Sequence, residues 1–130
     1  MQMYANIGAQ MITQLHHVQL AMPHGQEAQA IGFYSDLLGF ATEPKPKALA
    51  ARGGVWFRQG DVRVHLGVET PFTPARKAHP AFLCDELDAL ARRLGDAKYP
   101  VEWDQNLAGF KRFYTADPFG NRIEILHPTA

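Results

Sequence analysis

The sequence contains one order of strand and helix signals twice. Each half begins with a strand, continues with an amphipathic helix and ends with a set of further strands. The halves are residues 14–70 and 77–127, and we take them as two units of a single domain that covers residues 1–130. The expected fold class is therefore α+β, with two βαβββ units in tandem whose mixed sheets curve around a shared cleft.

The first unit opens with alternating apolar and polar residues, which indicate a strand with one buried face. The next apolar residues recur at helical spacing and end at Gly39, a residue type that often terminates helices. A short Gly60-Asp61 turn between two apolar runs predicts a hairpin. The predicted elements are a strand at 15–22, a helix at 27–38, a mobile loop at 42–53, and hairpin strands at 55–59 and 62–68.

The second unit repeats this order after a linker, residues 69–77, that is rich in proline and threonine. Its helix is expected to be capped by Asp85 and to stop at Gly95. Its last two strands are joined by residues 117–121, Asp-Pro-Phe-Gly-Asn, a sequence typical of a tight turn. The predicted strands of this unit are 79–84, 101–103, 111–115 and 122–126.

Composition excludes several classes of function. Hydrophobic residues make up 46% of the chain, which suffices for a core, and 13 basic residues balance 13 acidic ones. This neutral balance without charge runs argues against nucleic-acid binding, and no apolar stretch is long enough to span a membrane. Because Cys84 is the only cysteine and no signal peptide is recognisable, we expect a cytoplasmic protein without an intramolecular disulfide.

Four potential metal ligands occupy matching places in the two units. His17 and His79 each lie near the start of the first strand of their unit, while His65 and Glu124 interrupt the apolar run of the last strand. Strand alternation directs the side chains of His65 and Glu124 away from the helix-covered face, toward the expected cleft. A largely buried carboxylate such as that of Glu124 requires a cation, and a metal ion supplies one.

Two imidazoles and one carboxylate form a facial triad that leaves coordination positions open for a substrate. His17, His79 and Glu124 are the expected triad, and His65 is the expected fourth ligand. An open position allows the metal to act as a Lewis acid on a substrate oxygen. We therefore expect one divalent ion per site, chosen from Zn, Ni, Fe, Mn and Co.

Three segments resemble the vicinal oxygen chelate superfamily, which includes glyoxalases, bleomycin resistance proteins and extradiol dioxygenases. They are HVQL at 17–20, FYSDLLGF at 33–40 and FYTADPFGNRIE at 113–124. The resemblance implies the same three ligands, and implies that His65 is either a fourth ligand or an acid–base residue. It also implies that Tyr114, and with it Arg112, contact an anionic or oxyanionic group of the substrate. Phe57 is interpreted as the first-unit counterpart of Tyr114, lining the cleft wall.

The branch of the superfamily favoured here is a metal-dependent glyoxalase-type lyase or isomerase. Its small substrate would chelate the metal through vicinal oxygens, Glu124 would move a proton between adjacent carbons, and His65 and Tyr114 would assist catalysis. The alternatives are an Fe(II) extradiol-type dioxygenase, a fosfomycin-type transferase and a non-catalytic small-molecule binding protein of the bleomycin-resistance type. The resemblance further implies a homodimer in which each metal takes ligands from both chains.

Overall fold

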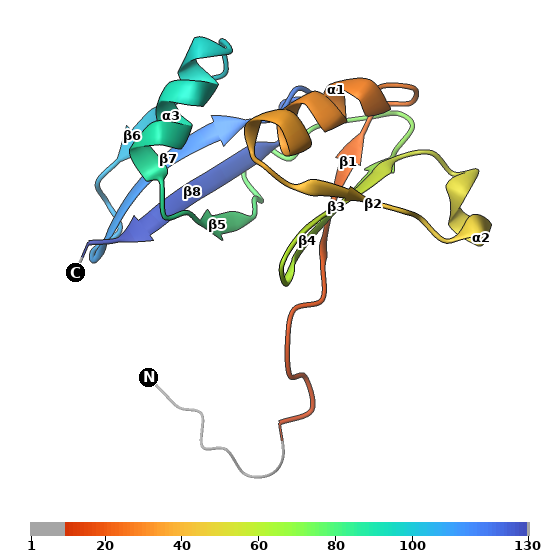
Figure 1. The fold of residues 1–130 in the computed structure, drawn as a ribbon, viewed down its shortest axis with the longest axis horizontal. Helices are drawn as coiled ribbons and strands as arrows, with labels where there is room; N and C mark the ends of the chain where they lie inside the picture. Colours follow the sequence, from red (N-terminus) through yellow and green to blue (C-terminus); the bar gives the residue numbers. More distant parts are fainter. Residues whose placement is uncertain (1–9, 130) are drawn as a thin grey trace.

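Two four-stranded mixed sheets form the fold, and each half of the chain builds one of them (Figure 1). The computed structural model describes residues 10–129. The first unit contains β1 (Val18–Met22), α1 (Glu27–Ile31), η1 (Gly32–Leu37), β2 (Ala41–Glu43), α2 (Lys47–Ala50), β3 (Val55–Gln59) and β4 (Val62–Val68). The second contains β5 (Ala81–Leu83), α3 (Leu87–Asp96), β6 (Glu102–Asp104), β7 (Phe110–Ala116) and β8 (Arg122–Pro128).

The two sheets have the same topology, which confirms the predicted repeat. The first sheet has the order β1-β4-β3-β2 and the second the order β5-β8-β7-β6. In each sheet the first strand of the unit runs parallel to the last, and the other neighbours are antiparallel. The register is equivalent as well, because Gln19 lies opposite His65 and Ala81 lies opposite Glu124. His17 and His79 therefore lie at equivalent positions, each two residues before the residue that pairs with His65 or with Glu124.

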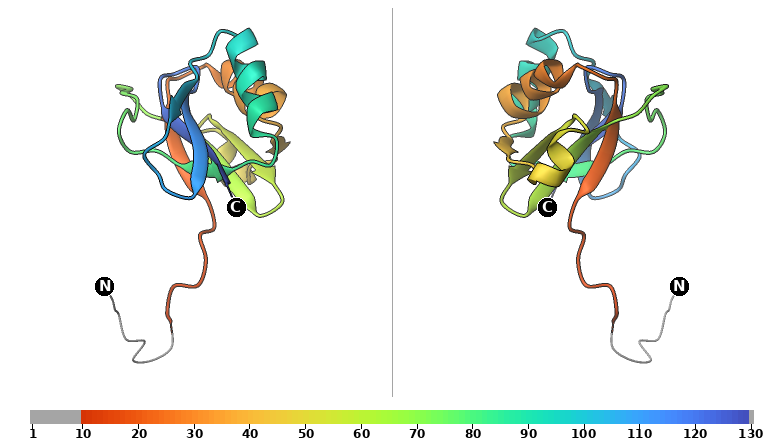
Figure 2. Two further views of the ribbon diagram at one scale, coloured as in Figure 1. Left: turned by 90° about the vertical axis from the view of Figure 1, so that its left-hand side faces the viewer. Right: turned by 90° about the vertical axis from the view of Figure 1, so that its right-hand side faces the viewer.

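The helices α1, η1 and α3 lie on one side of the sheets, where they cover the core, whereas α2 lies apart from them (Figure 2). The predicted helix at 27–38 is present, but its second half is a π-helix, η1. Apolar side chains from both units meet beneath α1, η1 and α3. Among the fully buried residues are Phe33, Tyr34, Phe57, Val64, Leu66, Leu94, Phe113 and Ile123. The opposite face of each sheet is left for the polar residues that the sequence places there.

The segment predicted as a mobile loop, 42–53, contains ordered elements, so that prediction is wrong. Its first residues belong to β2, which pairs with β3, and α2 follows at Lys47–Ala50. Pro46 precedes α2, and its carbonyl accepts hydrogen bonds from the amides of Leu49 and Ala50. Proline is favourable at a helix start, and alanine, leucine and lysine are strong helix formers, so the segment folds as a short helix.

Both predicted ends of α3 are also wrong. The helix begins at Leu87 after Glu86, with no capping hydrogen bond from a side chain, and Gly95 lies inside it. The chain leaves the helix at Lys98, which has a φ of 71°. The amide of Tyr99 then bonds to the carbonyl of Leu94, and the Tyr99 ring packs on Phe33 at 4.9 Å. Packing of Tyr99 into the core therefore sets the end of the helix.

A buried polar network joins the two units. The hydroxyl of Tyr34 donates to Asp117 (2.7 Å), and the side-chain amide of Asn121 donates to the carbonyl of Ala21 (2.8 Å). The amide of Ala75, in the linker, donates to Asn121 Oδ1 (3.0 Å). The turn at 117–121 thus holds the first unit, the linker and the second unit together. In residues 10–129 no helix has the length and apolarity needed to cross a membrane.

Candidate metal centre

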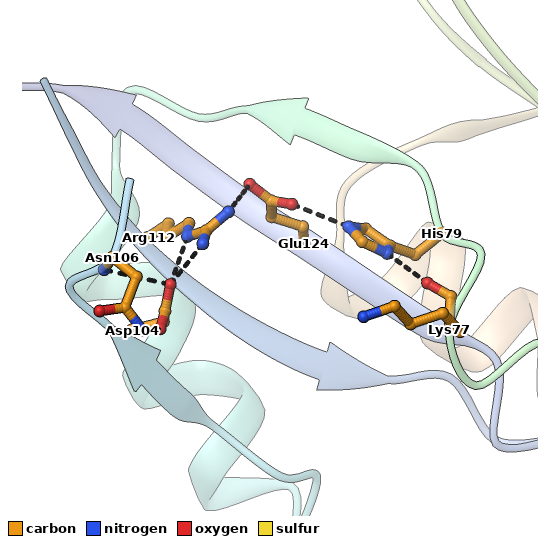
Figure 3. A network of polar contacts seen from close by, with 6 residues as sticks. All are labelled: Lys77, His79, Asp104, Asn106, Arg112 and Glu124. Carbon is orange, nitrogen blue, oxygen red and sulfur yellow. Dashed lines mark hydrogen bonds and ion pairs between the residues drawn. The ribbon is translucent and has the colours of Figure 1, made fainter. Parts of the chain in front are cut away.

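The second sheet brings His79 and Glu124 together. His79 lies just before β5 and Glu124 in β8, and His79 Nε2 is 2.8 Å from Glu124 Oε1 (Figure 3). His79 Nδ1 is 2.8 Å from the carbonyl oxygen of Lys77, which can only accept, so Nδ1 carries a proton and donates it. This fixes the ring and directs Nε2 at the carboxylate. Glu124 itself is 5% exposed.

Arg112 holds the other oxygen of the same carboxylate. Its Nη1 donates to Glu124 Oε2 (3.1 Å) and its Nε donates to Asp104 Oδ2 (2.7 Å). Asn106 donates through its side-chain amide to Asp104 Oδ1 (2.8 Å). The guanidinium lowers the pKa of Asp104 through this hydrogen bond. Figure 3 shows these contacts running across the sheet as one network, with Arg112 between the two carboxylates.

The first sheet brings His17 and His65 together in a stack of three rings. The ring of His65 lies 4.2 Å from that of His17 and 4.0 Å from that of Trp56. Burial of His65, with the neighbouring charge of His17, lowers the pKa of His65, so its imidazole stays neutral to lower pH. Neutral imidazole is the form that binds metals. A hollow of about 710 Å³ opens beside this stack.

The two pairs remain apart within one chain. Across residues 10–129, no three histidine, cysteine or acidic side chains are close enough to hold one metal ion. The structure therefore brings together His79 with Glu124, and His17 with His65, without combining the four. Their equivalent registers make each pair one half of a possible site.

The His79–Glu124 pair fits a divalent cation. With Nδ1 protonated, Nε2 of the neutral ring has a lone pair, and a lone pair 2.8 Å from a carboxylate oxygen is favourable only when a proton or a metal cation lies between the two atoms. Two adjacent ligands of one metal, each bound at about 2.1 Å, lie about 3 Å apart, close to the spacing found here. The hydrogen bond from Nδ1 to a backbone carbonyl is also typical of histidines that bind metals.

Tyr114 lies beside this pair, opposite Glu124 in the β7–β8 register. Its ring is 5.4 Å from the ring of His79. The guanidinium carbon of Arg112 lies 5.2 Å from the Tyr114 ring, and that of Arg122 lies 3.8 Å from it. Arg122 was missed in the sequence, although it precedes Glu124 by two positions in a strand and so shares its face.

The prediction that Phe57 is the counterpart of Tyr114 is wrong. In the β3–β4 register, Trp56 lies opposite His65, as Tyr114 lies opposite Glu124. Phe57 is one position further along, so its side chain points to the other face. There it is fully buried and stacks on Tyr34 in the core, at 5.3 Å. Trp56 is therefore the aromatic residue on the ligand-bearing face of the first sheet.

A mainly apolar cavity of about 700 Å³ is lined by residues of both units. His17 and His79 both lie at its boundary, together with Phe40, Phe82 and Leu90. The cavity shows that the first strands of the two units face a common space without closing on each other.

Comparison with known proteins gives one family and one consistent fold. The family model described as Glyoxalase/Bleomycin resistance protein/Dioxygenase superfamily matches residues 14–125. A solved structure of a glyoxalase family protein from Bacillus anthracis is 40% identical, with a TM-score of 0.90, and the match covers 94% of this chain and 100% of that one. A search of curated proteins gave no match.

Two more distant structures share the fold alone. The fosfomycin resistance protein FosX from Listeria monocytogenes is 15% identical with a TM-score of 0.72, over 92% of this chain and 96% of that one. TnmS3, an antibiotic binding protein from Streptomyces sp. CB03234, is 21% identical with a TM-score of 0.71, over 93% of this chain and 100% of that one. The fold thus serves resistance and binding proteins as well.

Proposed function

Because the chain belongs to the glyoxalase, bleomycin resistance protein and dioxygenase superfamily, we propose that it is a metal-dependent enzyme of the glyoxalase type. It would be a lyase or isomerase acting on a small substrate with vicinal oxygens. The observation that carries this proposal is the contact of His79 Nε2 with Glu124 Oε1, with the imidazole fixed from behind by the Lys77 carbonyl.

His17, His65, His79 and Glu124 are the residues that would hold one divalent ion. The bound metal would act as a Lewis acid that stabilises negative charge on a substrate oxygen. Two imidazoles from one sheet and an imidazole with a carboxylate from the other suit Zn, Ni, Fe, Mn or Co.

Glu124 is the residue that we propose to move a proton between neighbouring substrate carbons. Arg112 holds its Oε2, so the carboxylate keeps one orientation and Oε1 remains on the side of His79. Low exposure of Glu124 limits competition from water for that oxygen. Tyr114, beside the pair, would orient the substrate.

We propose that the complete site forms between two chains. Each chain has both halves of the ligand set, but at separate places. Large apolar side chains near the ligands are exposed, namely Leu15 (77%), two residues before His17, and Leu83 (72%) in β5. Exposed apolar groups beside a functional face are typical of surfaces that bind a partner. A twofold dimer would pair the first unit of each chain with the second unit of the other.

The test is metal content after purification without chelators, followed by two assays. About one divalent ion per chain is expected, as the facial-triad chemistry requires. We expect isomerisation of methylglyoxal adducts with at least one thiol and no oxygen uptake with catechols. Absence of metal, even after reconstitution with each candidate ion, would contradict the proposal.

One observation favours a second candidate, an Fe(II) dioxygenase of the extradiol type. His65 is buried, and its lowered pKa keeps the imidazole neutral and able to accept a proton from a substrate hydroxyl. Oxygen uptake with catechols in the presence of Fe(II), without thiol-dependent isomerisation, would assign the chain to this class. Metal binding with inactivity in both assays would point to a transferase or a binding protein.

A further inference from the structure

A small hollow with two arginines lies beside Tyr114, next to the candidate metal centre. Its volume is about 280 Å³. The charged residues around it are Arg76 from the linker, Arg122 from β8 and Glu102 from β6. Two arginines and a single glutamate thus line one opening, so the lining has a positive balance. Neither arginine belongs to the residues predicted from the sequence.

The fold, rather than chance, brings the two arginines together. The backbone amide of Arg122 donates to the carbonyl of Ala75 (2.8 Å), the residue before Arg76. Ala75 is also held by the fully buried side chain of Asn121, and the neighbouring Pro74 packs over Gly120 so closely that a side chain there would contact it at 3.3 Å. The linker backbone is therefore held against the start of β8, which places Arg76 next to Arg122.

Arg122 forms no ion pair within the described residues, in contrast to Arg112. Arg112 is shared between Asp104 and Glu124. Within the part of the chain that the structure describes, no carboxylate lies within ion-pair distance of Arg122 or Arg76. The Arg122 guanidinium lies over the Tyr114 ring, and stacking of this kind holds the group in place while its N–H donors at the rim stay available.

The position of Arg122 connects this hollow with the proposed reaction. Arg122 and Glu124 are two residues apart in β8, on the same face, at a spacing of about 7 Å. Tyr114 lies opposite Glu124 and beside His79. A molecule of a few carbon atoms could therefore contact Arg122 with one end and Glu124 with the other.

We propose that Arg122 and Arg76 form a subsite for an oxyanionic group of the substrate, a carboxylate or a phosphoryl group. The substrate is then a small anion whose charged end lies over Tyr114 and whose vicinal oxygens face His79 and Glu124. The placement of the vicinal oxygens at His79 and Glu124 rests on the proposed function, whereas the anion subsite does not. Guanidinium groups donate paired hydrogen bonds to both kinds of oxyanion, which explains why arginine serves here.

The test is titration of the full chain with malonate and, separately, with inorganic phosphate, followed by NMR of the backbone amides and arginine side chains. We expect saturable shifts at Tyr114, Ala116 and the Arg122 Nε–H. In Arg122→Gln the affinity should fall about tenfold or more, consistent with loss of a charged hydrogen-bonding partner. Tighter binding of malonate would identify a carboxylate, and tighter binding of phosphate a phosphoryl group.

Arg92→Gln is the matched control, because Arg92 is an exposed arginine of α3 outside this hollow. Its anion affinity should equal that of the unmodified chain. Arg76→Gln, which changes an exposed side chain and should leave folding intact, is expected to weaken binding several-fold even if Arg122→Gln proves unstable. Unsaturable shifts, or equal losses in the Arg76 and Arg92 variants, would overturn the proposal.

The titration needs no bound metal, so the two proposals can fail separately. Anion binding without any metal binding would keep the subsite and remove the proposed enzyme function. Metal binding and isomerase activity without anion binding would keep the function and remove the subsite.

Discussion

At the scale of single residues, the centre depends on how each polar side chain is restrained by its neighbours. Glu124 is positioned by His79 on one oxygen and by Arg112 on the other. Arg112 in turn is held by Asp104, whose pKa it lowers. The carboxylate proposed as a metal ligand is therefore oriented by Arg112, which is not itself one of the proposed ligands.

Arg112→Lys tests this orienting role. A lysine ammonium cannot reach both carboxylates with the fixed geometry of a guanidinium, so Glu124 should lose its single orientation. We expect metal affinity to fall about tenfold, a typical effect of changing a group that orients a ligand. Competition with a chromophoric chelator measures the affinity.

Arg93→Lys is the control for this variant, because the guanidinium of Arg93 also donates a hydrogen bond, to the carbonyl of Leu37, but Arg93 belongs to α3 and lies outside both halves of the proposed site. Its metal affinity should be unchanged. Equal affinities of the Arg112 variant and the unmodified chain would show that Arg112 does not orient Glu124.

At the scale of elements, the turn at 117–121 is the joint between the units. Asp117 Oδ1 accepts from the amides of Phe119 and Asn121, while its Oδ2 accepts from the Tyr34 hydroxyl and the Asn121 side chain. Burial and the charge of Asp117 raise the pKa of Tyr34 well above its ordinary range. The hydroxyl is thus kept protonated as a donor between η1 and the turn.

Tyr34→Phe removes that donor and should destabilise the chain by about 2 kcal/mol at pH 7, the usual effect of losing a hydrogen bond to a charged group. The raised pKa predicts a second effect. The stabilisation is complete below the ordinary tyrosine pKa of 10.0 and is lost as the pH rises, because the unfolded chain ionises while folded Tyr34 does not. Urea unfolding at pH 7 and above pH 10.0 measures both.

The Tyr34→Phe variant and the unmodified chain share all other tyrosines. The difference between their free energies of unfolding therefore reports on Tyr34 alone. The difference in the free energy of unfolding between Tyr34→Phe and the unmodified chain should decrease above pH 10.0. A difference that stays constant would mean that Tyr34 ionises equally in the folded and unfolded states.

Most of the architecture, but not all of the site, could be predicted from the sequence. Apolar periodicity located both units, and strand parity placed His65 and Glu124 on the face opposite the core. The error at Phe57 arose because the pairing register of a hairpin is set in three dimensions, and an offset of one residue exchanges the faces. The chain leaves α3 at Lys98 and not at Gly95, because packing of Tyr99 on Phe33 outweighs the tendency of glycine to end a helix.

At the scale of the whole molecule, the separation of the two ligand pairs predicts that chains with different defects complement each other. His17→Ala and Glu124→Gln would each be inactive as pure proteins. In a refolded equal mixture about half of the dimers are mixed, and each has one intact site of two, so about a quarter of the unmodified activity should return. Activity of the mixture measures this directly.

His17→Ala mixed with His65→Ala is the control, because both changes affect the same half of the site. In every mixed dimer, each of the two sites then lacks one of these histidines. No activity should return. An inactive mixture of His17→Ala with Glu124→Gln, despite confirmed mixed dimers, would place all ligands of each site in one chain.

His17 and His65 lie on one sheet, and His79 and Glu124 lie on the other. This separation makes the proposed activity depend on the concentration of the protein. If a catalytic centre requires one pair from each of two molecules, a folded monomer has no complete site and is inactive. Dilution then switches the protein off without unfolding it, and a rise in its own concentration switches it on. The amount of protein present would act as its own effector.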